Sequence, residues 1–308
     1  MAFPVYNLHM HVTGLGQCSL DYLSLVDVYP QVDTKKEVLE WHEQGGGPVA
    51  TALVALSRLG VSCCFCGITG DDEAGRKIRQ SLAYEGVDLK GLVKREGSSS
   101  QLAFIAIEKN TAKRTIFWRR PSGKALQPDE LEKDFLSGSD FLLVDGLMLE
   151  ASSAAVKRAR EMNIPSMLDA GSARPGMAGL AALCDYIVAS EVFAEGLGWG
   201  LTPEALLKEL KALQVSAITV TQGENGSITA ADGRIIRMPA FAVESVDTTG
   251  AGDVFHAGYV YGLLQGWDLE RVLRFASALA ALACTKVGGR TGIPGLDEVT
   301  EFLRAHDE

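Results

Sequence analysis

The chain has 308 residues, of which 47% are hydrophobic and 22% charged, enough to build one large α/β domain or two smaller ones. Its formal net charge is −10 and no long basic run occurs, which argues against nucleic acid as a partner. Neither a run of 18 apolar residues nor a basic, apolar leader is found, so we expect no membrane span and no signal peptide.

Strand-like and helix-like segments alternate along most of the chain. Apolar or alternating runs predict strands at Tyr6–Val12, Phe141–Val144, Ser166–Leu168, Tyr186–Val188 and Ala217–Val220. Helical periodicity predicts helices at Val49–Leu59, Ala151–Met162 and Pro203–Leu213. The pattern favours an α/β fold with a central, mostly parallel sheet flanked by helices. In such folds ligands bind beyond the carboxyl ends of the strands.

Two regions depart from this alternation. Leu20–Trp41 is extended and mixed in polarity, and Gln101–Trp118 reads as two alternating strands around the hairpin KNTAK. Neither has a crossover helix, so they predict a small β-sheet lid contributed by about residues 18–41 and 101–120. We expect one domain over residues 1–308, ending in helices of which Phe275–Cys284 is almost wholly apolar and therefore buried.

Three cysteines lie together in VSCCFCG. Cys63 and Cys66 form a C-x-x-C pair, but no second pair or nearby histidine completes a zinc set. The surrounding residues resemble a buried strand, in which free cysteine acts as a small hydrophobe. This use of cysteine favours a reducing compartment, the cytoplasm.

The stretch DTTGAGDVF, residues 247–255, is the most informative. Gly250, Ala251 and Gly252 precede or open a helix, where unpaired N–H groups and the helix dipole attract an anion. Asp253 beside them could accept a proton from an attacking hydroxyl, as phosphoryl transfer to an alcohol requires. Taken alone, G-x-G-D is more often an ordinary helix start whose acid complements the dipole.

The full stretch resembles the C-terminal signature of the ribokinase (PfkB) family of carbohydrate kinases, and the resemblance covers nearly the whole chain. GGGPVATALVALSRLG, residues 45–60, resembles the family's N-terminal signature. The resemblance implies a ribokinase-like fold in which Gly46 and Gly47 pack against the sugar. Thr51 stands where many members have a sugar-binding Asn, which keeps a hydroxyl for hydrogen bonding but loses the amide.

Asp21 follows Gly16 by five residues, which is the spacing of the family's substrate-binding aspartate. A carboxylate there would grip sugar hydroxyls through charge-assisted hydrogen bonds. The rival interpretation of GLGQCS as a dinucleotide fingerprint lacks its third glycine and its helix. A nicotinamide-dependent oxidoreductase is therefore a weak alternative.

The nucleotide side is indicated by TQGENGSI, which follows a predicted strand. Thr221, Gly223 and Gly226 occupy the positions of the family's ATP-phosphate loop, and no Walker A sequence occurs. Gly288 and Gly289 resemble the loop on the adenine side. The preceding Ala280–Cys284 is more typical of the core.

The metal signal is incomplete. Many members carry N-x-x-E to organise magnesium through water, whereas this chain has SEVF, which leaves Glu191 as the candidate. Magnesium is still expected, because ATP chemistry requires charge neutralisation between phosphates. Asp247 resembles a position that helps to hold a monovalent cation in some relatives, so potassium is a second candidate ion.

Other charged residues near the predicted cleft have two readings each. Asp169 and Arg174 follow a predicted strand, and Arg120 follows the lid hairpin. The two arginines could touch phosphates or a charged sugar, or they could be ordinary surface residues. His256 is expected to be a packing residue, because Asp253 already supplies a base.

The resemblance implies an ATP-dependent kinase that phosphorylates a hydroxyl of a sugar or sugar derivative. Its partners would be the sugar, ATP and a second copy of the chain, bound through the lid. In motif detail the chain is nearest to the sulfofructose-kinase branch, although a neutral ketose or hexose or another anionic sugar is equally admissible. A non-catalytic sugar or nucleotide sensor is the main alternative, supported by the missing N-x-x-E.

Overall fold

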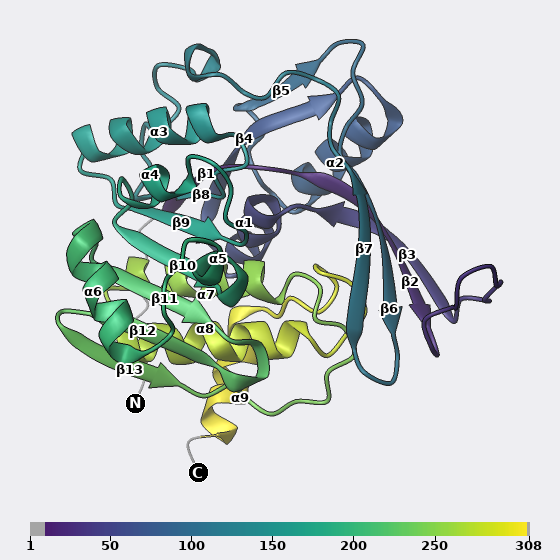
Figure 1. Cartoon of the computed structure of the whole chain (residues 1–308). Coiled ribbons are helices and arrows are strands. Elements are labelled where there is room, and N and C mark those ends of the chain that lie inside the picture. The colour runs from purple at the N-terminus through teal and green to yellow at the C-terminus, as the bar shows by residue number, and fades with distance from the viewer. Residues whose placement is uncertain (1–9, 307–308) are drawn as a thin grey trace.

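A nine-stranded sheet forms the centre of the protein, whose computed structural model describes residues 10–306 (Figure 1). Its order is β13-β12-β11-β10-β9-β8-β1-β4-β5, parallel from β5 to β11 and antiparallel at β12 and β13. The strands are β1 (His11–Leu15), β4 (Ser62–Gly70), β5 (Leu92–Arg95), β8 (Phe141–Val144), β9 (Ser166–Ala170), β10 (Tyr186–Ser190), β11 (Ala217–Thr221), β12 (Ser227–Ala231) and β13 (Arg234–Met238). The predicted mostly parallel sheet is confirmed.

The predicted strands agree closely with this sheet. Those that start at residues 141, 166, 186 and 217 are confirmed as β8, β9, β10 and β11, and the last three run one or two residues further than predicted. For the prediction Tyr6–Val12, residues 6–9 lie outside the described residues, and β1 begins at His11. A dinucleotide fingerprint would need a helix after β1, but the chain continues from Gly16 into lid strand β2 (Ser19–Val26).

Helices cover both faces of the sheet (Figure 1). One face packs against α1 (Pro48–Arg58), α2 (Glu73–Tyr84), α7 (Ala251–Leu264), α8 (Leu269–Ala283) and α9 (Leu296–Ala305). The other packs against α3 (Leu149–Glu161), α4 (Met177–Ala181), α5 (Glu191–Gly196) and α6 (Pro203–Leu213). Strand side chains alternate between the two layers, so Met167 and Val188 join the first core and Leu168 and Ile187 the second. α1, α3 and α6 confirm the three predicted helices within two residues at each end.

The lid is a separate four-stranded sheet that projects from the body (Figure 1). Its order is β3-β2-β6-β7, with β3 (Glu40–Gly46), β6 (Leu102–Glu108) and β7 (Lys113–Arg119) beside β2. This confirms the predicted small sheet and the hairpin around KNTAK. The first predicted lid segment ended at Trp41, but β3 runs on to Gly46 and carries the glycine turn into the site.

Two further expectations concern burial. Cys63, Cys64 and Cys66 lie buried within β4, as expected for a core strand. Between residues 10 and 306, no helix is long and apolar enough to cross a membrane. The division into a single domain over residues 1–308 stays a prediction.

Candidate active site

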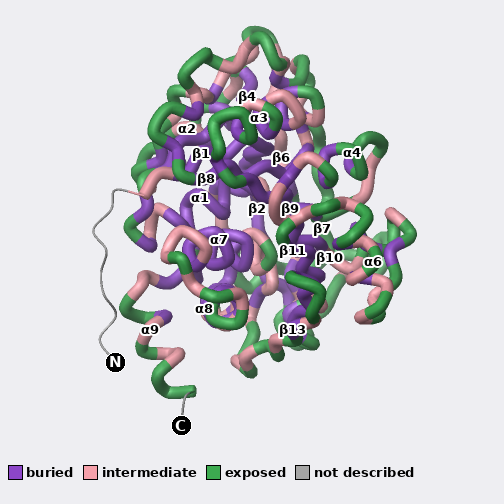
Figure 2. Tube along the Cα trace, turned by 90° about the vertical axis from the view of Figure 1, so that its left-hand side faces the viewer, coloured by how far each residue is buried: buried purple, intermediate pink, exposed green. Residues whose placement is uncertain are grey.

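The glycine-rich turn immediately precedes α7, a largely buried helix that Figure 2 shows in the middle of the molecule. Gly250 is the N-cap residue with φ 74°, and a Cβ there would lie 2.9 Å from Gly289 Cα, so only glycine fits without strain. Ala251, Gly252 and Asp253 form the first turn. The Ala251 N–H donates to the Thr248 carbonyl at 3.3 Å, and the first N–H groups of a helix have no partner within it, which suits the turn to an anion.

Asp253 is half-buried at this turn. Burial raises the pKa of its carboxyl group well above the ordinary value, and the neighbouring Asp169 carboxylate raises it further. His256 and Arg114 act in the opposite direction. A carboxylate of raised pKa is a stronger proton acceptor, which suits a general base.

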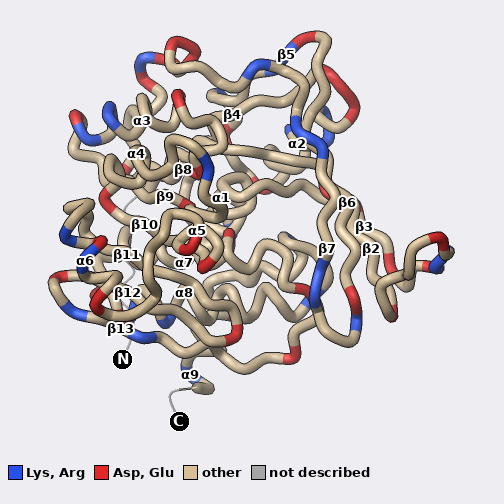
Figure 3. The backbone as a smooth tube through the Cα atoms, in the orientation of Figure 1, with Lys and Arg blue, Asp and Glu red and all other residues tan. Residues whose placement is uncertain are grey.

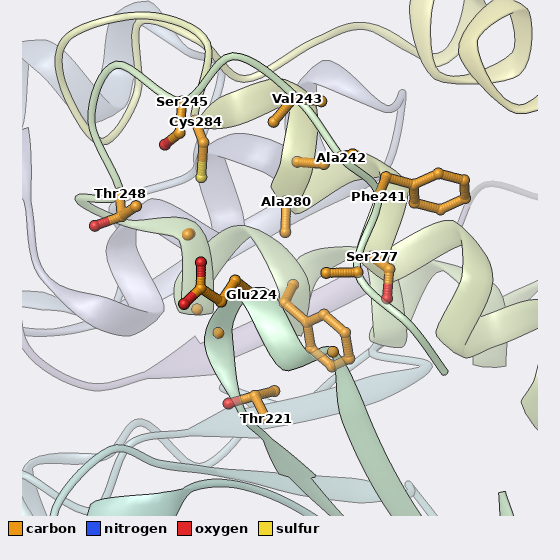
Figure 4. A pocket seen from close by; sticks show the side chains of 17 residues that line it. Thr221, Glu224, Phe241, Ala242, Val243, Ser245, Thr248, Ser277, Ala280 and Cys284 are labelled. Carbon is orange, nitrogen blue, oxygen red and sulfur yellow. The ribbon is translucent and has the colours of Figure 1, made fainter. Parts of the chain in front are cut away.

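A cavity of about 540 Å³ opens beside this turn (Figure 4), a size typical of sites for small molecules and cofactors. It brings together Thr221, Gly223 and Gly226 with Ala251 and Gly252. The first three lie at the end of β11 and around the short 3-10 helix Gly223–Asn225. The predicted phosphate loop and the anion turn therefore share one cavity.

The opposite wall of this cavity was not predicted. Ser277, Ala280, Ala281 and Cys284 of α8 and its C-cap line the cavity. The expectation that Ala280–Cys284 is more core than contact therefore holds for Leu282 and Ala283 but not for the three residues that line the cavity. Residues 240–243 and 245 also line the cavity, and Figure 4 shows Phe241, Ala242, Val243 and Ser245 among them. Small residues spaced three or four apart on α8 are the signal that could have revealed a face open to a ligand.

Gly288 and Gly289 are not among the residues that line this cavity. Instead, the Gly288 N–H donates to Asp247 Oδ2 at 2.8 Å, and Gly289 packs against Gly250. Asp247 Oδ1 accepts from the backbone N–H and the hydroxyl of Thr249, at 2.8 and 2.7 Å. Asp247 thus ties the anion turn to the Gly288–Gly289 loop.

On the other side of Asp253, the lid contributes the predicted sugar residues. Asp21 on β2 is buried, accepts a hydrogen bond from Ser19 Oγ at 2.6 Å, and has a pKa raised by burial. A Cβ on Gly46 would overlap the Asp21 carboxylate, and Gly47, with φ 97°, would likewise meet the Gln17 carbonyl. The predicted aspartate and glycine pair therefore meet in space.

Arg290 lies beneath this turn and was missed in the sequence analysis. Its side chain is buried and donates to the Gly46 carbonyl at 3.2 Å, to Ser81 Oγ at 3.2 Å and to Thr51 Oγ1 at 3.4 Å. Burial lowers its pKa to about 10, against the attraction of Asp21. Thr51 is 2% exposed in α1 and contacts this arginine. Arg290 follows the predicted Gly288–Gly289 pair, but no local pattern says that it is buried.

The inner face of the lid carries two arginines of β7 and its continuation. Strand register places Trp118 across Ala103 from Asp21, and the Arg120 guanidinium lies 4.8 Å from the Trp118 ring centroid. Arg114 donates to Thr248 Oγ1 of the anion turn at 2.7 Å. Figure 3 shows the basic positions at both ends of β7. The lid thus carries the predicted sugar residue Asp21 and also contacts the anion turn through Arg114.

Asp145 and Arg174 form a polar pair at the carboxyl ends of β8 and β9. Asp145 is buried and accepts from the backbone N–H groups of Gln17 and Leu147, at 2.7 and 2.8 Å. Burial raises its pKa to about 6. Arg174 is partly buried, its Nη2 donates to the Asp145 carbonyl at 3.4 Å, and its Nε has no hydrogen-bond partner.

The metal candidate Glu191 opens α5. Its Oε1 accepts from Gln222 Nε2 at 3.0 Å, which holds the carboxylate beside Thr221 of the cavity. Ser190 caps the helix instead of offering an amide, since its Oγ accepts from the Phe193 N–H at 3.0 Å. Residues 10–306 contain no group of three potential metal-ligating side chains. The donor set fits an ion carried largely by phosphates and water, as magnesium commonly is.

Comparison with protein families and curated relatives places these features in context. The family model described as "pfkB family carbohydrate kinase" matches residues 12–296 of this chain. The chain is 29% identical over 301 residues to the ribokinase of Bacillus subtilis (strain 168), covering 95% of this chain and 99% of the relative. It is 28% identical over 306 residues to fructokinase-1 of Zea mays, covering 91% and 95%.

Solved structures agree with this. A crystal structure of a ribokinase candidate from Agrobacterium tumefaciens superposes with a TM-score of 0.89 at 28% identity, covering 98% of this chain and 100% of that one. A ribokinase II candidate from E. coli in complex with ATP and Mg²⁺ has a TM-score of 0.82 at 22% identity, covering 96% and 100%. The second likeness concerns the fold alone.

Proposed function

Because the chain belongs to the PfkB family of carbohydrate kinases, we propose that it transfers the γ-phosphoryl group of ATP to a hydroxyl of a sugar or sugar derivative. The observation that carries this proposal is the position of Asp253. It follows Ala251 and Gly252, which line the nucleotide cavity, and it lies close enough to Asp21 for that carboxylate to affect its pKa. A base at the junction of the two sides suits direct transfer between two bound substrates.

In this mechanism Asp253 accepts the proton of the attacking hydroxyl. The N–H groups from Gly250 to Asp253 stabilise the negative charge that develops during transfer. Asp21 and the Gly46–Gly47 turn orient the sugar, and Thr51 supports that turn through Arg290. The lid excludes water, so that ATP is not hydrolysed without a sugar.

The nucleotide occupies the cavity between α8 and the β11 loop. Thr221, Gly223 and Gly226 hold its phosphates. Gly288 and Gly289 contribute indirectly, since they contact Asp247 and Gly250 and so stabilise the anion turn. Glu191 is the residue that would hold magnesium, which supplies charge neutralisation between the phosphates when bound.

A potassium ion near Asp247 is a finer part of this proposal. Both carboxylate oxygens of Asp247 already accept hydrogen bonds from Thr249 and Gly288, so the ion would stabilise a loop that is largely formed. Turnover in potassium should exceed turnover in tetramethylammonium at equal ionic strength. Equal rates would remove potassium from the mechanism.

We also propose that the acceptor carries an anionic group. Arg120, on the Trp118 face of the lid, and Arg174, with its free Nε, form no ion pair with a carboxylate among residues 10–306. Two such cations beside the sugar side suit a phosphate, carboxylate or sulfonate. Assignment to the sulfofructose-kinase branch stays a prediction.

The test is ADP release from magnesium-ATP with a panel of acceptors: fructose, fructose phosphates, sulfofructose, ribose, 2-keto-3-deoxygluconate and nucleosides. Asp253→Asn should lower kcat on the preferred acceptor by about 10²–10⁴. Asp232→Asn removes a carboxylate from the exposed β12–β13 turn and is the matched control. Near-normal turnover of Asp253→Asn would remove the base from the mechanism.

A sensor is the second candidate, favoured by the replacement of N-x-x-E with a helix cap at Ser190. Binding of ATP without turnover on any acceptor would support it.

Arg174→Gln and Arg120→Gln refine the substrate class. Each should raise KM for an anionic acceptor about tenfold while leaving KM for ATP unchanged. A rise confined to ATP would assign these arginines to the nucleotide.

We propose that two copies associate through the lid. The outer face of this sheet exposes Trp41, Phe104 and Phe117, and Tyr22 stacks on Phe104 at 5.3 Å between centroids. An exposed aromatic cluster of this kind is typical of an interface. Sedimentation should show a dimer that Phe104→Lys dissociates, whereas a monomeric wild type would refute it.

A cytoplasmic location completes the proposal. The six cysteines are free and buried, and none forms a disulfide. This use of cysteine is typical of a reducing compartment.

A further inference from the structure

His256 lies on α7 one turn after Asp253, and it is 6% exposed. Its Nδ1 is 2.5 Å from the Gly252 carbonyl oxygen, and its Nε2 is 3.1 Å from the Val188 carbonyl oxygen. Nε2 is also 3.5 Å from Asp169 Oδ1. The imidazole therefore joins the anion turn to β10 and to β9.

Both ring nitrogens of His256 face hydrogen-bond acceptors. A neutral imidazole carries one N–H and one lone pair, so in either tautomer a lone pair would point at a carbonyl or carboxylate oxygen. Donation from both nitrogens requires the imidazolium form. Asp169, which accepts no other hydrogen bond from the described residues and whose buried Oδ2 has no partner, is the counter-ion.

Most of the charged groups around this pair are acidic. Asp145 raises the pKa of Asp169, and Asp169 raises that of Asp253, because like charges buried together are costly. Burial has the largest effect on the pKa of His256 and lowers it below the ordinary value, against the Val188 and Gly252 carbonyls and the Asp253 carboxylate. The imidazolium assignment therefore rests on the two acceptors that face the ring nitrogens and on the distance to Asp169. The other charged groups that act on Asp253 are Asp21 of β2, Arg114 of β7 and Arg290 of the loop before α9.

We propose that His256 is a positioning residue: protonated on both nitrogens and paired with Asp169, it fixes the Gly252 carbonyl of the anion turn and neutralises the carboxylate beside Asp253. Asp253 is then left as the ionised base. This inference rests on the proposed role of Asp253 but not on the identity of the sugar. It replaces the expectation that His256 only packs.

The protonation state can be observed without activity. In protein with ¹⁵N-labelled histidine at pH 7.5, both ring nitrogens of His256 should have the chemical shifts of imidazolium. The signals are assigned by their loss in His256→Gln, or by elimination among the five histidines if that variant does not fold. A neutral ring, with one unprotonated nitrogen, would overturn the proposal whatever the kinetics show.

The kinetic test uses the acid limb of kcat/KM, which reports the pKa of the base in the free enzyme. His256→Gln leaves Asp169 uncompensated, so the limb should move to higher pH by about one unit, and kcat should fall about tenfold. Asp169→Asn removes the nearby negative charge, so the limb should move to lower pH by a similar amount.

Opposite shifts are the signature of this pair. A merely structural defect would lower kcat in both His256→Gln and Asp169→Asn without shifting their acid limbs in opposite directions. Acid limbs that stay in place in both variants, or that move in the same direction, would overturn the proposal. Asp232→Asn should leave the limb unchanged. If Asp253→Asn is fully active, the base assignment fails, while the ¹⁵N result still stands or falls on its own.

Discussion

The two proposed binding regions are built by opposite physical means. The proposed nucleotide side is a cavity with walls of small and apolar residues, such as Ala280 and Phe241, and of glycine backbone. The proposed sugar side consists of buried charged groups: Asp21 and Arg290 lie around the Gly46 turn, and Asp145 accepts a hydrogen bond from the Gln17 N–H.

This difference separates generic from specific recognition. A cavity of small side chains reads shape and leaves most polar contacts to the backbone, which suits a common nucleotide. Buried charged groups lose much free energy if a ligand does not complete their hydrogen bonds, so they discriminate between similar sugars. Mutations on the two sides should therefore have separable effects.

Among the substitutions that test the separation of the two sides, Gly46→Ala is expected to have the largest effect. The new Cβ would overlap the Asp21 carboxylate, so KM for the sugar should rise about 100-fold while the dissociation constant of ATP stays unchanged. Steady-state kinetics and calorimetry measure the two quantities. Gly179→Ala, where a Cβ meets open space, is the control. An unchanged sugar KM would contradict the arrangement.

Ala280→Leu should produce the converse result at a smaller scale. The larger side chain intrudes into the nucleotide cavity from α8, so KM for ATP should rise about tenfold, while KM for the sugar changes less than twofold. Ala178→Leu places the same group on the exposed side of α4 and should change neither. Equal effects on both substrates would mean that the sides are not independent.

The smallest effect concerns stability and pH. The pKa of Asp145 is raised from 3.8 to about 6 by burial, so the native state keeps a proton that the unfolded chain has lost in this interval. The free energy of unfolding should therefore fall as pH rises through it, by up to about 3 kcal/mol from this residue.

Urea unfolding between pH 4 and 7 measures this slope. Asp145→Asn cannot ionise, so its slope should be shallower than that of the wild type. Asp21 also has a pKa raised by burial and acts in the same direction. Equal slopes for the wild type and Asp145→Asn would show that Asp145 ionises in the native state at its ordinary pKa.

Local patterns were sufficient for much of the fold. The parallel strands, the helices between them and the lid hairpin follow from periodicity, because burial of one or both faces leaves a repeat in the chain. Gly250 and Gly46 could also be recognised locally, because the residues that follow each of them mark the start of a helix. Lengths were less certain: β3 continues past Trp41 to Gly46 because the lid sheet pairs it with β2.

The elements, the anion turn with Asp253 and the residues that resemble a sugar kinase can all be recognised in the amino-acid sequence. Which distant groups share their surroundings depends on the tertiary structure. Arg290 lies 244 residues from the Gly46 carbonyl that it holds, and His256 meets Val188 across 68 residues. Such contacts leave no periodic trace, because a single buried charge is selected by its partners in space and not by its neighbours along the chain.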